Sequence, residues 1–221
     1  MRQYVVCDHA VGTDPGALTL VAEWFCGARH FCNIAADCRQ STYCPHIFAT
    51  SALDENQVLV WDVRRKETPE AEAEGPPQSC DFFLRIDSAK LALPKPGGMV
   101  TSLLICSSEE SVAPTDGKSE HFSLFIGLEG GLVVLVDSHD PERAMAVAVL
   151  PEDQPVLSLD MDVRRGVVAA GSAAGALYSM KFPESASHSI AETGAPVLTV
   201  PVVATMLPEP GKHIVAAYSY Q

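Results

Sequence analysis

The stretch HIFATSALDENQVLVWDVRR, residues 46–65, contains two short apolar runs on either side of a polar segment. Ile47–Ala52 and Val58–Trp61 are rich in the β-branched and aromatic residues that favour strands. Asp54–Gln57 between them is entirely polar and suits a turn. The stretch therefore predicts a β-hairpin whose second strand closes on the pair Trp61-Asp62.

This strand–turn–strand unit recurs along the chain, and Asp137 takes the place of Asp62 in a later copy. The place of Trp61 is taken in the other copies by different residue types: Cys7, Val136 and Met180. Successive places lie 54, 75 and 44 residues apart. The 75-residue step contains two polar, low-complexity insertions of 16 and 15 residues, at 64–79 and 107–121. Without these insertions the step shortens to 44 residues.

A period of about 40–45 residues with four short strands per repeat is typical of WD40 β-propellers. We therefore predict an all-β fold that is a partial WD40-type β-propeller, with about four blades' worth of strands. A two-sheet sandwich also has short strands at even spacing, but the glycine-bearing turns before the third strands favour the propeller. The predicted units are a half blade at 1–27, blades at 28–88, 98–150 and 155–193, and a half blade at 196–221.

The composition excludes several classes of function. The 221-residue chain has a net charge of −13, which is unfavourable for binding a nucleic acid backbone, so protein partners are expected. No apolar run approaches the roughly 20 residues that a membrane span needs. The first residues lack the apolar stretch of a secretory signal, so we expect an intracellular protein with no membrane partner.

Seven cysteines, an odd number, favour reduced thiols over a disulfide framework. Four of them recur at every sixth residue and are weak candidates for a metal site: Cys26, Cys32, Cys38 and Cys44. Zinc sites usually contain ligand pairs spaced by two to four residues, so buried strand thiols are the favoured interpretation. We therefore predict no metal and no cofactor.

Motifs of catalysis are absent from the sequence, including the P-loop and the common hydrolase signatures. Gly127–Gly131 is rich in glycine but precedes a strand, so it is expected to be a turn. Asp160 and Asp162 are a same-face carboxylate pair that general acid–base chemistry uses, but such residues usually face a turn or the channel of a blade. We predict that the protein is not an enzyme.

Between Cys80 and Phe182 the chain resembles one WD-repeat family, that of the guanine nucleotide-binding protein beta-subunit-like protein and its fungal counterpart, the ASTRA-associated WD-repeat protein. The segments that carry the resemblance are Lys90-Leu91 with Pro94 and Gly97-Gly98-Met99, then LFIGLEGGLVVLVD (124–137), QPVLSLDMD (154–162) and AAGSAAGAL (169–177). The resemblance implies a seven-bladed propeller that acts as a scaffold. It also implies partners in the ASTRA and co-chaperone complexes, roles in chromatin remodelling and in maturation of PI3K-related kinases, and a location in nucleus and cytoplasm.

The chain departs from that family in two ways. Only Trp61, Asp62 and Asp137 keep the structural Trp-Asp positions, and no Gly-His pair precedes a first strand. Its length is also short of the about 300 residues that seven blades need. A truncated gene product, a closed four-bladed ring and an open arc are the alternatives. The alternative functions are a metal-binding or enzymatic propeller that uses Cys26–Cys44 and a G-beta-like signalling adaptor.

Overall fold

The computed structural model describes residues 3–5, 22–24, 32, 34–36, 47–62, 84–107, 121–182 and 198–206. Within these residues, regular structure consists of fifteen strands and one short 3-10 turn, η1 (Ser88–Lys90). The all-β prediction is confirmed. No helix in these ranges has the length and apolar character needed to cross a membrane.

The predicted hairpin of residues 46–65 forms the centre of a four-stranded antiparallel sheet. Phe48 lies opposite Trp61, and the turn at residues 52–56 joins the two strands. Every side chain of the first strand is buried, as the apolar sequence predicts for a strand covered on both faces. The sheet order follows the chain: β3 (Ala35–Ala36), β4 (Ile47–Ser51), β5 (Gln57–Asp62) and β6 (Leu84–Asp87).

The second sheet has the same consecutive antiparallel order with one added strand. Its strands are β7 (Val100–Ser107), β8 (Phe122–Leu128), β9 (Leu132–Asp137) and β10 (Asp140–Val149). All six residues of β9 are buried, which fits a strand at the centre of the sheet. The added strand, β14 (Leu198–Val200), pairs in parallel with the outer edge of β10.

The third sheet comprises β11 (Val156–Asp162), β12 (Val167–Ser172), β13 (Leu177–Lys181) and β15 (Val202–Met206). Residues 198–206 lie within the half blade predicted at 196–221. In the structure they form two strands on the sheets of the second and third blades, with Pro201 between them. Proline lacks a backbone N–H and interrupts a ladder, which explains the division.

Two strands near the start of the described chain form a separate antiparallel pair. Tyr4 of β1 (Gln3–Val5) lies opposite Glu23 of β2 (Ala22–Trp24). Both strands lie within the half blade predicted at 1–27. Residues 183–193 of the blade predicted at 155–193 lie outside the described residues, as do nearly all residues of the two insertions.

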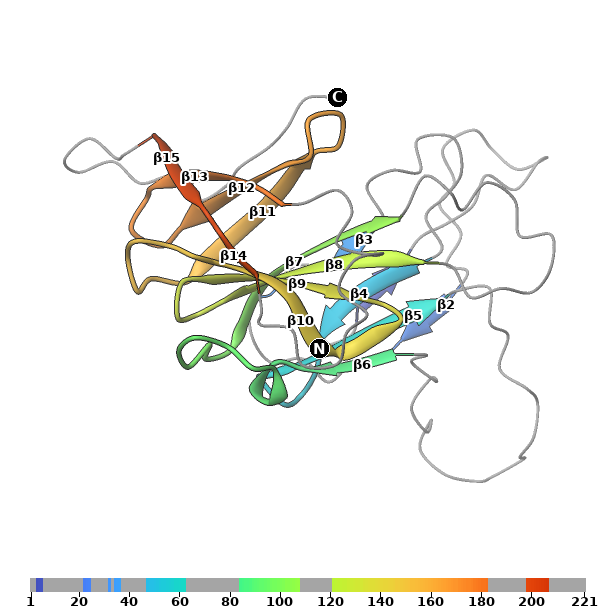
Figure 1. Ribbon diagram of the computed structural model, residues 1–221. Coiled ribbons are helices and arrows are strands. Elements are labelled where there is room, and N and C mark those ends of the chain that lie inside the picture. The colour runs from blue at the N-terminus through green and yellow to red at the C-terminus, as the bar shows by residue number, and fades with distance from the viewer. Residues whose placement is uncertain are drawn as a thin grey trace, which may run out of the picture.

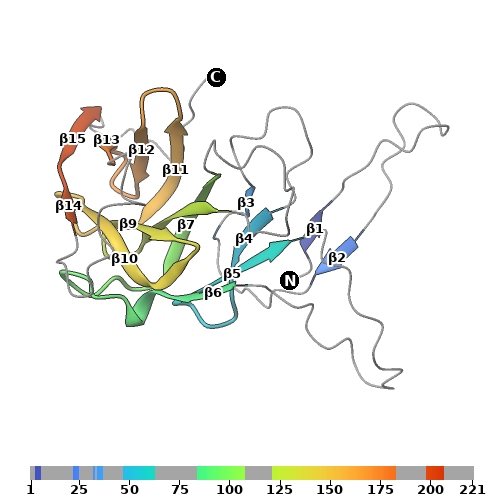
Figure 2. The same ribbon diagram turned by 45° about the vertical axis from the view of Figure 1, so that its right-hand side comes forward.

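The three larger sheets stand side by side, with β7 in contact with β11 on one side and with β3 and β4 on the other (Figures 1 and 2). One hydrophobic core joins the first and second sheets and contains Val60 and Ile126. Another joins the second and third and contains Phe125 and Tyr178. Four-stranded antiparallel sheets packed face to face are the blades of a propeller, so the described chain forms part of a β-propeller, as predicted.

Candidate functional site

One side of the three blades is built from hairpin turns and the linkers between sheets. In the second blade, β8 leads into the turn at residues 129–131 and β9 leads away from it. Because the strands of each blade run in the same alternating order, the corresponding turns and the linkers between blades share this side. We call it the linker face, and it comprises residues 52–57, 88–99, 129–131, 150–155 and 173–176.

Backbone hydrogen bonds join the segments of the linker face into one belt across the three blades. Each bond connects a turn to a linker rather than two residues of one ladder. With the donor nitrogen first, they are Val100 to Glu55 (2.9 Å), Glu129 to Met99 (2.9 Å), Gly130 to Gly97 (2.7 Å), Leu150 to Gly131 (2.9 Å) and Ala173 to Pro155 (2.8 Å). Because these bonds fix backbone positions, the side chains of the face are held on a rigid frame.

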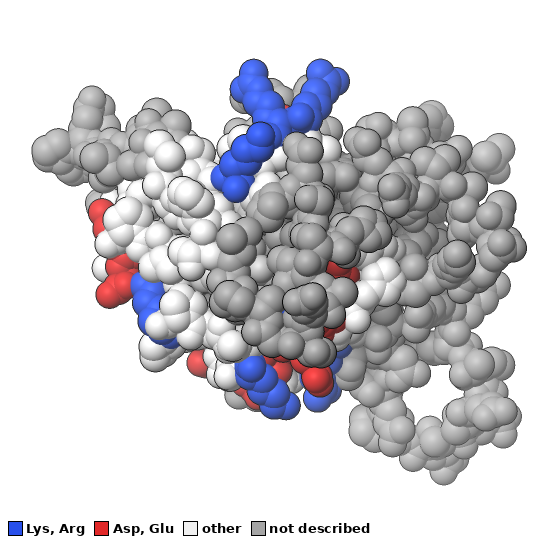
Figure 3. All heavy atoms as spheres, in the orientation of Figure 1, with Lys and Arg blue, Asp and Glu red and all other residues white. Residues whose placement is uncertain are grey.

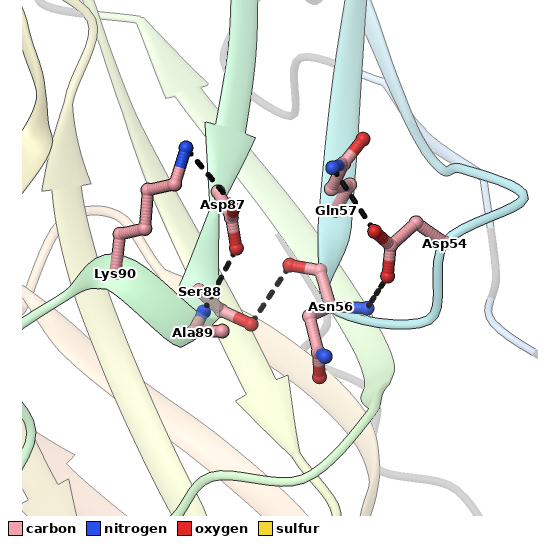
Figure 4. A network of polar contacts seen from close by, with 7 residues as sticks. All are labelled: Asp54, Asn56, Gln57, Asp87, Ser88, Ala89 and Lys90. Carbon is pink, nitrogen blue, oxygen red and sulfur yellow. Dashed lines mark hydrogen bonds and ion pairs between the residues drawn. The ribbon is translucent and has the colours of Figure 1, made fainter.

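The turn of the first blade is held by the side chain of Asp54 (Figure 4). Its carboxylate accepts hydrogen bonds from the backbone N–H of Asn56 at 3.4 Å and from Nε2 of Gln57 at 3.1 Å. Such bonds from an acidic side chain to residues two and three places ahead are typical of Asx turns. Residues 54–56 therefore form the turn that the sequence predicted for 54–57, and Gln57 begins β5.

A second group of contacts ties this turn to η1 in the next linker (Figure 4). The hydroxyl and the backbone N–H of Ser88 both donate to the carbonyl oxygen of Asn56, each at 2.8 Å. Asp87 caps η1 by accepting from the N–H of Ala89 at 3.1 Å, and Lys90 lies 3.5 Å from its carboxylate. The bonds from Ser88 to Asn56 connect segments 32 residues apart in the sequence.

Acidic side chains outnumber basic ones at the exposed positions of the linker face. The exposed acids are Asp54, Glu55, Glu129 and Asp153. Lys90 is also exposed, while the less exposed Lys95 forms an ion pair with Asp153 across the two linkers. Figure 3 shows acidic and basic side chains next to one another at the left and lower margins of that view, with further Lys and Arg side chains at the top.

Glu152 anchors the second linker to the third blade. The hydroxyl of Tyr178, a side chain that is 1% exposed, forms a hydrogen bond with the Glu152 carboxylate. Burial raises the pKa of Tyr178, and the nearby negative charge of Glu152 adds to the effect. Tyr178 therefore stays a neutral donor to this carboxylate at ordinary pH.

Asp137, one of the predicted Trp-Asp positions, lies at the opposite end of the second blade between two histidines. Its carboxylate lies 2.8 Å from Nε2 of His121 and accepts a hydrogen bond of 2.8 Å from the backbone N–H of His139. The two imidazole rings stack with centroids 4.8 Å apart. One ligand atom from each of the three residues lies within 4.8 Å of the others. Among the described residues, this is the group whose side chains lie close enough together to hold a metal ion.

The other two predicted Trp-Asp positions, Trp61 and Asp62, lie at the end of β5. Trp61 is 5% exposed and donates its indole N–H to the hydroxyl of Thr50 at 3.0 Å. Asp62 follows it at the end of the strand and is partly exposed. The indole N–H of the buried Trp61 therefore has a hydroxyl partner within its own blade. The sequence contains no Gly-His pair before a first strand that could supply a histidine as this partner.

Of the four candidate metal cysteines, only Cys32 lies within the described residues. Its side chain packs against the first core, and burial raises the pKa of its thiol to about 12 despite hydrogen bonding to Ser51. A thiol that holds its proton is a poor metal ligand, because metals bind the thiolate. Cys26, Cys38 and Cys44 lie outside the described residues.

Asp160 and Asp162, the carboxylate pair considered for catalysis, make local contacts. Asp160 accepts from the N–H of Met161 at 2.8 Å. Asp162 accepts from the N–H of Arg165 at 3.2 Å and lies 3.6 Å from its guanidinium, which closes the β11–β12 turn.

The sequence analysis missed the pair of histidines around Asp137, because His121 and His139 are 18 residues apart in the chain. The spacing Asp137-Ser138-His139 is a local signal for part of this group.

No family model matches the chain, and no curated protein matches it in sequence. Two solved structures are similar in fold. The β-propeller domain of Cps50 (Swd1) from Myceliophteria thermophila matches with a TM-score of 0.35 and 6% identity, covering 83% of this chain and 61% of that one. Hsv2 from Kluyvelomyces marxianus matches with a TM-score of 0.24 and 10% identity, covering 76% of this chain and 68% of that one. TM-scores below 0.5 carry no argument about this chain, and the blade assignment rests on the strand order described above.

Proposed function

We propose that the protein is a non-enzymatic protein–protein interaction scaffold whose linker face binds a basic segment of a partner protein. The observation that carries this proposal is the belt of hydrogen-bonded turns and linkers across three blades, with its exposed acids. A rigid surface loses little conformational entropy on binding, which favours affinity. The acidic side chains supply charge complementarity to lysines and arginines.

The partners proposed are subunits of the ASTRA and co-chaperone complexes, in nucleus and cytoplasm, with roles in chromatin remodelling and in maturation of PI3K-related kinases. The family resemblance supports this choice, because all four segments that carry it pass through the linker face. They contribute residues 90, 91, 94, 97–99, 129–131, 154–155 and 173–176 to it. A stable interface needs about 800 Å² per partner, which turns and linkers from several blades can supply together.

The test is capture of partners from cells by the tagged full chain, followed by mass spectrometry. The variant is the double substitution Glu55→Lys and Asp153→Lys, which reverses two exposed charges on the linker face. The matched control is Asp140→Lys with Glu142→Lys, which makes the same charge change at exposed positions where β10 begins, at the opposite end of the strands.

We expect subunits of co-chaperone or chromatin-remodelling complexes to be recovered with the unmodified chain and with the control. The linker-face variant should lose at least about 90% of them, and recovery should fall with added salt because the contacts are charged and exposed. Equal recovery with both variants would exclude the linker face. Recovery of general chaperones alone would contradict the scaffold function.

A further inference from the structure

We propose that His121, Asp137 and His139 bind one divalent transition-metal ion of the zinc type at the end of the second blade opposite the linker face. Two imidazoles and one carboxylate, with ligand atoms within 4.8 Å of one another, are ligands that zinc uses in proteins. This assignment is independent of the proposed scaffold function, because six residues of strand, about 20 Å, separate the cluster from the 129–131 turn.

The carboxylate is already positioned by the backbone. Asp137 is 7% exposed, and its Oδ1 accepts the hydrogen bond from the N–H of His139. Its Oδ2 faces Nε2 of His121 at 2.8 Å. One oxygen is therefore oriented by the chain, as in the supporting shell of a metal site, and the other is directed at the second ligand.

The ends of β8, β9 and β10 determine the positions of the three ligand residues. His121 directly precedes β8, and Ser138 next to Asp137 exchanges hydrogen bonds with Phe122 at 3.0 and 3.1 Å. Asp137 and His121 are thus held together by the ladder and by these bonds. His139 follows in the two-residue turn to β10, where its side chain is 59% exposed and free to take up a new rotamer.

A metal ion fits after two small changes. Ligand atoms around a tetrahedral zinc ion with bonds of about 2.1 Å lie about 3.4 Å apart, so the 2.8 Å contact opens slightly. The rings of His121 and His139 lie only 13° from parallel, so the exposed His139 ring has to turn to direct a nitrogen at the same ion. Solvent occupies the remaining coordination position.

A neutral imidazole offers one ring nitrogen with a lone pair, so the ion would take the place of the hydrogen bond between His121 and Asp137. The bound ion would link His121, the residue before β8, to Asp137, the last residue of β9. It would also fix His121, the residue at which the predicted 107–121 insertion ends.

The test is titration of the chelator-stripped full chain with Zn²⁺ by calorimetry, with Co²⁺ as a spectroscopic probe of the ligands. We expect one ion per chain, a Co²⁺ spectrum without thiolate charge-transfer bands, and a higher melting temperature with Zn²⁺. His139→Ala should weaken binding at least about 10-fold and abolish the shift in melting temperature. Asp137→Asn should act in the same direction.

Two control variants test whether other candidate ligands contribute to metal binding. Asp162→Asn removes a partly exposed acid at another strand end, and Cys32→Ser removes the described candidate cysteine, so both should leave binding unchanged. Stoichiometric binding that survives His139→Ala together with His121→Ala would overturn the site, as would thiolate bands in the Co²⁺ spectrum. Should Asp137→Asn fail to fold, the exposed His139→Ala still decides the question.

Discussion

At the scale of single residues, Trp61 and Thr50 form a buried hydrogen bond of 3.0 Å between neighbouring strands of the first blade. Thr50→Val keeps the shape of the side chain and removes the acceptor of the indole N–H. Because the donor is then left buried without this partner, the free energy of unfolding should fall by about 1–3 kcal/mol. Urea denaturation followed by circular dichroism measures the change.

Thr50→Ser is the matched control for this bond. It keeps the hydroxyl and removes one methyl group, which costs about 1 kcal/mol or less. A loss of stability in Thr50→Val no larger than that in Thr50→Ser would show that the hydrogen bond contributes nothing beyond packing.

The raised pKa of the Cys32 thiol affects the stability of the protein at alkaline pH. Burial raises the pKa of its thiol from 9.0 to about 12, so the folded state binds the proton more tightly than the unfolded state. Its contribution to stability is therefore complete below about pH 9 and is lost as the pH rises from 9 towards 12. At pH 8, the thiolate population should be about 1,000-fold smaller than that of an unperturbed thiol.

The measurement is the rate of iodoacetamide labelling of Cys32 at pH 8, read by peptide mass spectrometry. Labelling in the folded chain should be slower than in urea by roughly the same factor of 1,000. Equal rates in both states would contradict the burial of this thiol.

At the scale of elements, two glycines with left-handed backbone shape the linker face. Gly131 has φ +72°, and a Cβ there would lie 2.5 Å from the carbonyl oxygen of Glu152. Gly98 has φ +70°, but its Cβ would meet only the side chain of Glu129, which can move. Gly131→Ala should therefore lower the free energy of unfolding by about 2–4 kcal/mol and Gly98→Ala by about 1–2 kcal/mol.

Thermal or urea unfolding of both variants measures this difference. Hydrogen exchange at the Leu150 amide, whose acceptor is the carbonyl oxygen of Gly131, locates the damage. If Gly98→Ala proved as costly as Gly131→Ala, the left-handed backbone alone would explain both losses, and the contact with Glu152 would not matter.

The strands that the sequence predicted best are those with local signals. The hairpin of β4 and β5 is correct because its apolar runs and polar turn are adjacent in the chain. β10 begins at Asp140, although Pro141 and the charged residues near it argue against a strand in the sequence. An irregular register between Asp140 and Ala144 accommodates them, and such bulges depend on the partner strand.

At the scale of the whole molecule, shared cores make the first two blades one cooperative unit. Ile126 of β8 is fully buried in the core that also contains Val58 and Val60 of β5. Ile126→Ala should cost about 2–5 kcal/mol. In a Trp24→Phe background the fluorescence of Trp61 reports on the first blade, and its urea midpoint should fall together with that of circular dichroism.

Val203→Ala is the control for this prediction. Val203 is 62% exposed, so its truncation should change the free energy of unfolding by no more than about 0.5 kcal/mol. A Trp61 transition that stays in place while circular dichroism shifts would show that the blades unfold separately.

The candidate sites illustrate what a single sequence conveys at this scale. The repeat predicted the blades because its signal lies in local periodicity. The linker face and the group around Asp137 depend on which segments meet in space, and residues such as Glu55 and Val100 are joined only by the fold. The positions of residues 198–200 and 202–206 on two different sheets were missed for the same reason, since either sheet edge accepts a short apolar strand.

The position of β15 has a consequence for the order in which the protein is made. The third blade lacks its outer strand until Val202–Met206 has been synthesised, 20 or more residues after β13 ends at Lys181. At about 5–20 residues per second, this leaves the edge of β13 unpaired for one to several seconds on the ribosome. An open edge is a template for wrong pairing, so this interval is when the nascent chain most needs a protecting factor.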